Sequence, residues 1–308
     1  MKYVAPSSPL SIGGVLDNWI QLFRASFSRC WAVALIAVVG TAVMQFLITP
    51  PLPAPGESPL LALQRVLAMM RVDGLLMLLS MLVTLVVNGA LLAQQVTIMR
   101  GDTPMSFSGA LGSGLRRLPQ MILAGVLLLL IFAAFCLPIG IGVAMTIAAG
   151  HSGHEPGPLS ALLILGGLAL AVIWIYVFVR LEFWLPAMFV DDCGGAASLG
   201  HSWRLVKGHW WRVTMITFVA LIIITILNMA ITWAATVLGG LFGLQAISAL
   251  ADPAQFIHRM RIVSAVAALG NVLILPLFTA MWLSIYQDLK LRREGGDLTA
   301  RAEALSGT

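Results

Sequence analysis

Residues of the types that metal and catalytic sites use occur in two places in this 308-residue chain. The first holds His151, His154 and Glu155, and two imidazoles three positions apart can share a metal ion. The surrounding Gly and Pro residues are more typical of a polar turn, and two ligands do not complete a site. We therefore expect no metal and no other cofactor here.

The second place holds Ser202 next to His201, with Asp191 and Asp192 ten residues earlier in the chain. A serine, a histidine and a carboxylate are the parts of a nucleophilic triad. Neighbouring residues of a helix point in different directions, so a hydrogen bond between Ser202 and His201 is not formed by default. We expect both side chains to face water, and we predict no catalytic residue and no enzymatic activity.

Three amides, Asn88, Asn228 and Asn271, lie in or near apolar segments, where polar groups often mark a transport pathway. Pro138 and Pro276 interrupt two of these segments, as prolines do in the broken helices of transporters. Neutral amides that bond between helices, at ~0.6 to 2 kcal/mol each, explain the same residues without a substrate. A small-solute or lipid transporter stays open as an alternative, and a polar cavity joining the three amides would favour it.

The elements that must position these residues are membrane spans. The chain is 59% hydrophobic and only 10% charged, and its mean hydropathy is +0.96. About 20 apolar residues cross the ~30 Å hydrocarbon layer of a bilayer, and six stretches reach that length. We predict one all-α membrane domain over 1–308, with a tail at 287–308 and spans at Trp31–Thr49, Gly74–Ala93, Met121–Ala149, Leu159–Val179, Val213–Leu238 and Ile262–Tyr286.

The first apolar run starts thirty residues into the chain and is longer than the 7 to 15 residues of a signal-peptide core, so we expect a retained helix. Orientation follows from Lys and Arg, which resist translocation. Arg65, Arg71, Arg259 and Arg261 fall on one side of the predicted spans, and fourteen basic residues on the other. We expect both termini in the cytoplasm of a bacterial inner membrane. The fourteen are Lys2, Arg24, Arg29, Arg100, Arg116, Arg117, Arg180, Arg204, Lys207, Arg212, Lys290, Arg292, Arg293 and Arg301.

Short stretches with helical apolar spacing precede the first, third and fifth spans, at 12–27, 107–118 and 196–210. They predict three amphipathic helices in the headgroup plane, with interfacial anchors at Trp19, Trp203, Trp210 and Trp211. Aligning the three stretches suggests a threefold helix-hairpin repeat. Alternating topology alone produces similar spacing, so the sequence leaves both explanations open.

Two further patterns concern single residues. Cys30, Cys136 and Cys193 are placed so that no two are natural disulfide partners, and we expect free thiols. Arg180, at the end of the fourth predicted span, is expected to extend toward lipid phosphate.

Two segments, 186–212 and 286–298, together with 12–31, resemble the uncharacterised bacterial six-span proteins similar to the membrane domain of glycerophosphoryl diester phosphodiesterases. The resemblance implies a membrane bundle. It implies no phosphodiesterase activity, because in the bifunctional relatives that chemistry belongs to a separate barrel domain that this sequence lacks.

The same two segments carry complementary charges, so we predict that they form one charged cytoplasmic surface. Its basic residues are candidates for binding anionic lipid headgroups, at ~1 kcal/mol each. The sequence therefore favours a non-enzymatic scaffold that faces lipid or a membrane-protein partner, and we expect no nucleic-acid partner. The candidate headgroup residues are Arg204, Lys207, Arg212, Arg292 and Arg293.

Overall fold

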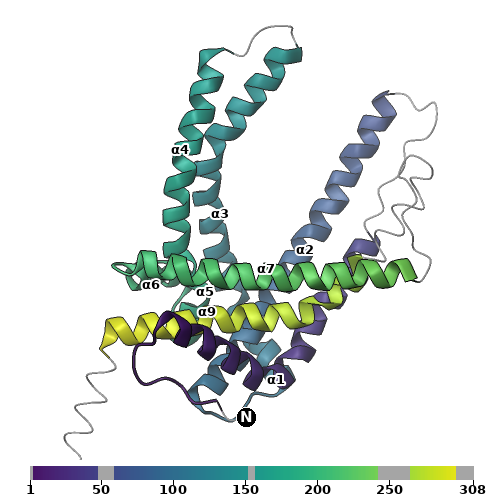
Figure 1. Cartoon of the computed structure of the whole chain (residues 1–308). Helices are drawn as coiled ribbons and strands as arrows, with labels where there is room; N and C mark the ends of the chain where they lie inside the picture. Colours follow the sequence, from purple (N-terminus) through teal and green to yellow (C-terminus); the bar gives the residue numbers. More distant parts are fainter. Residues whose placement is uncertain (1–2, 48–58, 152–156, 242–263, 296–308) are drawn as a thin grey trace, which may run out of the picture. The chain divides into compact units, whose positions relative to one another are not determined.

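The computed structural model describes residues 3–47, 59–151, 157–241 and 264–295 (Figure 1). Within these ranges every regular element is a helix, and the short stretch 264–269 is helical too. The labelled helices are α1 (Ile12–Leu47), α2 (Pro59–Arg100), α3 (Phe107–His151), α4 (Pro158–Leu181), α5 (Trp184–Val190), α6 (Gly195–Val206), α7 (Trp210–Leu241) and α9 (Asn271–Glu294).

Six helical segments of the described chain are long and apolar enough to cross a bilayer, which confirms the predicted number of spans. The chain is therefore an all-α, multi-pass membrane protein. The six segments are Ile12–Gly40, Gly74–Arg100, Phe107–Gly150, Pro158–Val190, Trp210–Leu238 and Ser264–Arg293.

The prediction of separate amphipathic helices before the first and third spans is wrong. α1 begins at Ile12 and continues through the first span, and α3 begins at Phe107 and continues through Pro119 and Pro138. No glycine or proline lies between Phe27 and Trp31 to end a helix. A proline inside a long helix removes one backbone hydrogen bond, a loss that the flanking turns of a membrane helix tolerate. At ~1.5 Å per residue α1 is roughly 54 Å long, so part of it extends beyond the hydrocarbon layer.

The third amphipathic stretch does form a helix of its own, α6, but this helix is shorter than the sequence predicts. Lys207 leaves the helical conformation, and Gly208 follows with φ +89°, a value that glycine adopts without steric cost. α7 then begins at Trp210, so Trp210 and Trp211 belong to a span helix and not to the amphipathic one. The placement of α6 in the headgroup plane stays a prediction, as does the threefold repeat.

The chain divides into two compact units, Met1–Leu118 with Ile216–Ile285 and Pro119–Met215 with Tyr286–Thr308. The core of the first unit lies where α1 packs on α2 and on the start of α3. Small side chains line this contact and let the helix backbones approach closely. The fully or nearly fully buried residues of this core are Cys30, Val33, Ala37, Val87, Ala90, Leu91 and Ala110.

Two buried polar side chains tie helices together inside the first unit. The Trp19 indole Nε1 donates to the Leu277 carbonyl at 2.7 Å, and the Gln95 amide Nε2 donates to the Pro276 carbonyl at 2.8 Å. Trp19 is only 1% exposed, so the structure contradicts its prediction as an interfacial anchor. The indole N–H needs an acceptor once it is buried, and the backbone of α9 supplies one.

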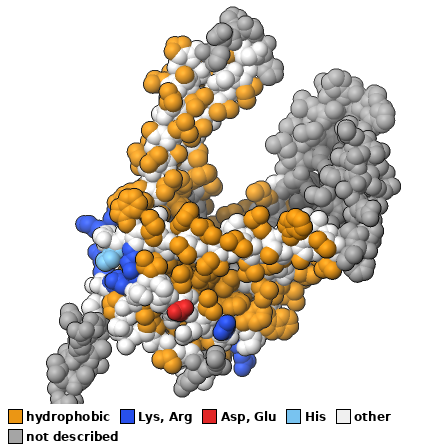
Figure 2. Space-filling view, viewed as in Figure 1, with side chains coloured by type: hydrophobic (Ala, Val, Ile, Leu, Met, Phe, Trp, Pro, Cys, Tyr) orange, Lys and Arg blue, Asp and Glu red, His pale blue; other side chains and the backbone are white. Residues whose placement is uncertain are grey.

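In the second unit α3 and α4 pair as a hairpin through two glycines. A Cβ at Gly167 would lie 2.2 Å from the Ile139 side chain, and one at Gly142 would lie 2.9 Å from that of Ile164. The outer faces of the hairpin stay apolar and uncovered: only 6% and 11% of the most apolar windows of α3 and α4 are buried. Hydrophobic side chains accordingly cover this hairpin in Figure 2. Such a surface fits contact with lipid or with another membrane protein.

The close approach of α3 to α2 gives a test of the first unit's packing. A Cβ at Gly114 would lie 2.4 Å from the Val86 carbonyl oxygen and 3.0 Å from the Ala90 nitrogen. Because backbone atoms cannot move aside as a side-chain tip can, we expect Gly114→Ala to lower the free energy of unfolding by about 1 to 3 kcal/mol. Thermal unfolding of the detergent-purified protein measures this loss.

The matched control is Gly112→Ala, two residues earlier in the same helix, where an added Cβ meets nothing within 4 Å. Alanine is the better helix former by up to ~1 kcal/mol, so this variant should be as stable as the parent or more stable. Equal melting temperatures for the two variants would contradict the packing described here.

Candidate functional site

A tight turn after α5 positions the carboxylate at the centre of the candidate site. The Asp191 backbone N–H donates to the Ala187 carbonyl at 3.0 Å and closes α5. Asp192 then adopts φ +56°, a left-handed conformation common where helices end. α6 starts at Gly195, where an added Cβ would lie 2.3 Å from the Gln120 carbonyl oxygen of α3. Only glycine permits this approach, so the turn and the start of α6 are fixed.

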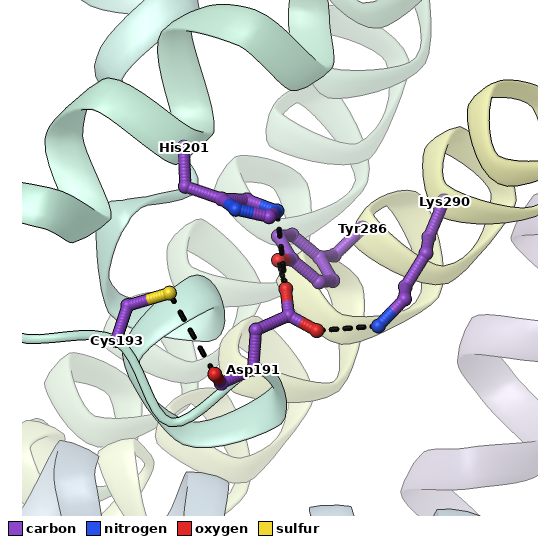
Figure 3. Close-up of polar contacts among 5 residues, drawn as sticks. All are labelled: Asp191, Cys193, His201, Tyr286 and Lys290. Atoms are coloured by element: carbon purple, nitrogen blue, oxygen red, sulfur yellow. Dashed lines mark hydrogen bonds and ion pairs between the residues drawn. The ribbon is translucent and has the colours of Figure 1, made fainter.

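The Asp191 carboxylate meets three side chains (Figure 3). Its Oδ1 receives a hydrogen bond from the Lys290 ammonium, and its Oδ2 receives one from the Tyr286 hydroxyl. His201 Nε2 lies 3.1 Å from the same Oδ2, and the imidazole stacks on the Tyr286 ring with centroids 6.3 Å apart. Both carboxylate oxygens are thus committed to contacts within the protein.

These contacts determine the protonation states of the Asp191 carboxyl and the Cys193 thiol. Burial raises the pKa of the Asp191 carboxyl, but hydrogen bonds from Lys290 and Tyr286, with the charges of Lys290 and His201, hold that pKa below its ordinary value. Burial, together with the negative charges of Asp191 and Asp192, raises the pKa of the Cys193 thiol. At neutral pH the carboxylate is therefore charged and the thiol is protonated.

A second carboxylate anchors the neighbouring basic residues. Asp288 is 1% exposed, and its Oδ2 accepts from Arg212 Nε at 3.2 Å and from Arg292 Nε at 3.1 Å. Arg293 Nη1 donates to the Lys207 carbonyl at 3.3 Å. Buried ion pairs of this kind need both partners, since removing one leaves an uncompensated charge.

Helical spacing explains how α9 serves both carboxylates. Tyr286 and Lys290 are four residues apart and share one face of α9, and so do Asp288 and Arg292. Tyr286 and Lys290 both bond to Asp191, whereas Asp288 of the second pair accepts from Arg212. The segments 186–212 and 286–298 therefore come together through their described residues, as the complementary charges predict. We call this region the α6–α9 surface: Asp191, His201, Arg204, Lys207, Arg212, Tyr286, Asp288, Lys290, Arg292 and Arg293.

Ser202 takes no part in a triad, and its predicted exposure to water is wrong. The side chain is fully buried: its hydroxyl donates to the Arg180 carbonyl at 2.7 Å and accepts from the Phe183 N–H at 3.1 Å. It thereby joins α6 to the end of α4, while His201 turns the other way toward Asp191. Neighbouring residues of a helix point ~100° apart, so Ser202 and His201 face different sides of α6. Where α4 ends, two backbone groups lack a partner within the helix, and the Ser202 hydroxyl bonds to both.

Arg180 also differs from its prediction. Its guanidinium lies 4.3 Å from the centroid of the Trp203 ring and 5.1 Å from that of Tyr176, and the residue is only 8% exposed. It is held in a cation–π stack and does not extend toward phosphate. Trp210 adds to this aromatic group, with its ring 5.6 Å from that of Tyr176 and 4.7 Å from that of Trp211.

The predicted headgroup residues fall into two classes. Arg212 and Arg292 are paired with Asp288, whereas Arg204, Lys207 and Arg293 keep exposed side chains. Figure 2 shows Lys and Arg side chains gathered with a histidine beside the end of the α3–α4 hairpin. Of the predicted anchors, Trp203 and Trp210 are half-buried and Trp211 is 70% exposed.

The family comparison matches residues 57–289 to the model of a domain of unknown function, DUF7847. The chain belongs to this family. No curated protein and no solved structure matches it. The matched range contains Asp191, His201, Tyr286 and Asp288, four residues of the α6–α9 surface. The resemblance to the membrane domain of glycerophosphoryl diester phosphodiesterases stays a prediction.

The remaining candidates of this DUF7847 chain are dispersed. Asn88 and Asn271 are half-buried, whereas Asn228 is exposed on α7. All three cysteines are free, as predicted. The side chains of His151, His154 and Glu155 lie outside the described residues. In the part of the chain that is described, no group of three or more His, Cys, Asp or Glu is placed to hold a metal ion.

Sequence reasoning missed the residues that organise the site. The sequence places Tyr286, which carries no charge, at the end of a predicted span, yet its hydroxyl donates to Asp191. Outside the site, in the first unit, sequence reasoning also missed Gln94 and Gln95, which are 2% and 0% exposed and whose amides donate to the carbonyls of Met105 and Pro276. Two adjacent glutamines near the end of a predicted span are a signal for such contacts, since buried amides must find partners.

The lowered pKa of Asp191 predicts a pH-dependent stability. Its folded-state pKa lies below the ~3.9 of an unfolded aspartate, so its stabilisation is present above that value and is lost as the pH falls through the folded pKa. We expect Asp191→Asn to lower the free energy of unfolding by about 1.5 to 3 kcal/mol at pH 7. The deficit should begin to shrink below about pH 4, where the unfolded carboxyl starts to take up a proton, and should disappear once the pH is below the folded-state pKa.

Thermal unfolding in detergent between pH 3 and pH 7 measures both effects. Asp17→Asn removes the same charge from an exposed position of α1 and should leave the melting temperature within a degree or two of the parent's at each pH. An Asp191→Asn deficit that stays constant over this range would show that the carboxylate charge is not what stabilises the turn.

Proposed function

We propose that this chain is a non-enzymatic membrane scaffold of the bacterial inner membrane, and that its α6–α9 surface meets anionic headgroups on the cytoplasmic side. The observation that carries the proposal is the exposure of Arg204, Lys207 and Arg293 beside an aromatic group, at the end of an apolar hairpin. Trp and Tyr favour the headgroup level of a bilayer, and basic side chains there attract anionic lipid.

The absence of catalysis is supported by how the reactive groups are used. A nucleophile needs a base within hydrogen-bond reach and a free position beside it for substrate. The Ser202 hydroxyl instead bonds to two backbone groups, and both oxygens of Asp191 are occupied. The Cys193 thiol, with its raised pKa, is a poorer nucleophile than an ordinary cysteine.

Transport receives less support than the scaffold. The alternative rests on Asn88, Asn228 and Asn271 facing a common polar pathway. Asn228 is exposed on α7, which favours a contact with lipid or with another protein over the lining of a pathway.

The proposed orientation predicts reporter activities. Fourteen of the eighteen Lys and Arg residues fall on the side that carries both termini in the predicted topology. Alkaline phosphatase, which is active only after export, should be inactive when fused after residue 300 and active when fused in the connection after His151. A cytoplasmic reporter at the same junctions should give the reverse pattern. Phosphatase activity after residue 300 would overturn the orientation.

The proposed lipid preference predicts an effect of removing two exposed charges. In bilayers that mix anionic phosphatidylglycerol with neutral phosphatidylcholine, spin-labelled lipids report which headgroup is held at the protein surface. We expect the parent to favour the anionic lipid and Arg204→Gln with Lys207→Gln to weaken that preference several-fold, since each charge contributes up to ~1 kcal/mol. Raising the salt concentration should weaken the parent's preference too.

The control removes the same net charge elsewhere, by Arg24→Gln with Arg116→Gln, both exposed positions. It should retain most of the preference. An equal loss in the control would assign the effect to net charge and not to the α6–α9 surface. No preference in the parent would reject the lipid proposal and leave the partner-facing scaffold.

A further inference from the structure

Two hollows lie along one side of α1 in the first unit. The first, which we call the polar cavity, has a volume of about 230 Å³ and a mixed lining whose polar residues are Tyr3, Ser28, Arg29 and Asp102. The second is a groove of about 440 Å³ lined by apolar residues and one glycine. The groove is formed by Ala32, Leu35, Ile36, Val39, Gly40 and Val83.

The α1 residues of the two hollows form a single stripe. Ala25, Ser28 and Arg29 line the cavity, and the groove continues at 32, 35, 36, 39 and 40. Steps of three and four return to the same face of a helix, so the two hollows follow one another along α1. From 25 to 40 the stripe is roughly 22 Å long at ~1.5 Å per residue.

α2 and the residues directly after it border both hollows from the other side. Ile98, Gly101 and Asp102 border the polar cavity, and Val83 borders the groove. The sixteen residues from 83 to 98 run antiparallel to the sixteen from 40 to 25, so the polar ends coincide. Arg29 and Asp102 lie where this helix pair leaves its apolar stretch.

The polar cavity carries both signs of charge. Arg29 and Asp102 are exposed, and in the described part of the chain neither is held in an ion pair. Tyr3 borders the cavity and donates to the Asn18 side-chain oxygen at 2.9 Å, which fixes the residues before α1 against it. A ligand that matches this end has one negative and one positive group close together.

We propose that the two hollows together bind one phospholipid with a primary amine in its headgroup, of the phosphatidylethanolamine type. The phosphate pairs with the Arg29 guanidinium, which matches its geometry well, and the ammonium pairs with the Asp102 carboxylate. One acyl chain lies in the groove lined by residues 32–40 and Val83. There it makes closer van der Waals contacts with the apolar walls than mobile lipid chains of the bilayer make. The site uses none of the α6–α9 residues, so it does not depend on the proposed function.

Native mass spectrometry of the full chain, released from detergent with added lipid, tests the site. We expect phosphatidylethanolamine to be retained in preference to phosphatidylglycerol of equal chain length. Arg29→Gln should lower the retained fraction of both lipids about tenfold, the loss expected for one charge-assisted contact. Asp102→Asn should lower phosphatidylethanolamine retention alone and reverse the preference.

The groove has its own variant and control. Gly40→Leu should reduce retention of every phospholipid, because a Cβ at residue 40 already lies 3.5 Å from Val83 Cγ1 and a larger side chain fills the space. Gly74→Leu is the matched change, at a position in α2 where an added Cβ meets nothing within 4 Å, and should retain lipid as the parent does. Melting temperatures confirm that each variant is folded.

Three outcomes would overturn the proposal. The first is equal retention of the two lipids by the parent. The second is unchanged retention of both lipids in both Arg29→Gln and Asp102→Asn. The third is displacement of the lipid by chain-free glycerophosphoethanolamine at similar concentration, which would place binding in the polar cavity alone.

Discussion

Hydrocarbon offers no hydrogen bond to a peptide group, and this constraint shapes the described chain. Every backbone donor and acceptor within a span must be paired inside the protein, so the regular elements that the structure describes are helices. The same rule governs buried side chains: the Trp19 indole and the Gln95 amide both reach carbonyls of α9. These contacts do what disulfides or a large soluble core do elsewhere, since they fix which helices are neighbours.

Hydrocarbon does not solvate charges either, and the charged side chains of the α6–α9 surface accordingly lie near the ends of the helices. Asp191 follows directly on α5, and its three partners come from α6 and α9. A carboxylate that is only 13% exposed is costly unless it is compensated. Lys290 supplies the opposite charge, and Tyr286 supplies a second donor. The turn at Asp191 therefore holds α9 to α5 and α6 through electrostatic contacts, in addition to apolar packing that buries Met188 and Leu289.

Sequence periodicity was sufficient to predict six spans and the meeting of the two charged segments, because both follow from length, hydropathy and charge. It could not predict where helices end. Amphipathic spacing looks the same whether a helix stops before a span or runs into it, and α1 continues where α6 stops at Gly208. It also could not predict which side chains face inward. Trp19 and Trp211 have the same chemistry, yet one is buried and the other exposed, and tertiary packing decides between them.

Some basic residues in and near the α6–α9 surface are paired or covered within the protein, and others are exposed to headgroups. A count of charges does not distinguish the two groups. Arg212 and Arg292 share Asp288, and Lys290 is matched by Asp191, so these charges add little to the field outside the protein. Arg180 is covered by Trp203 and is screened in a different way. The potential felt by a headgroup comes mainly from the cations left exposed. A short list of exposed cations, set beside aromatic residues, is thus a more specific recognition feature than the overall charge of +5.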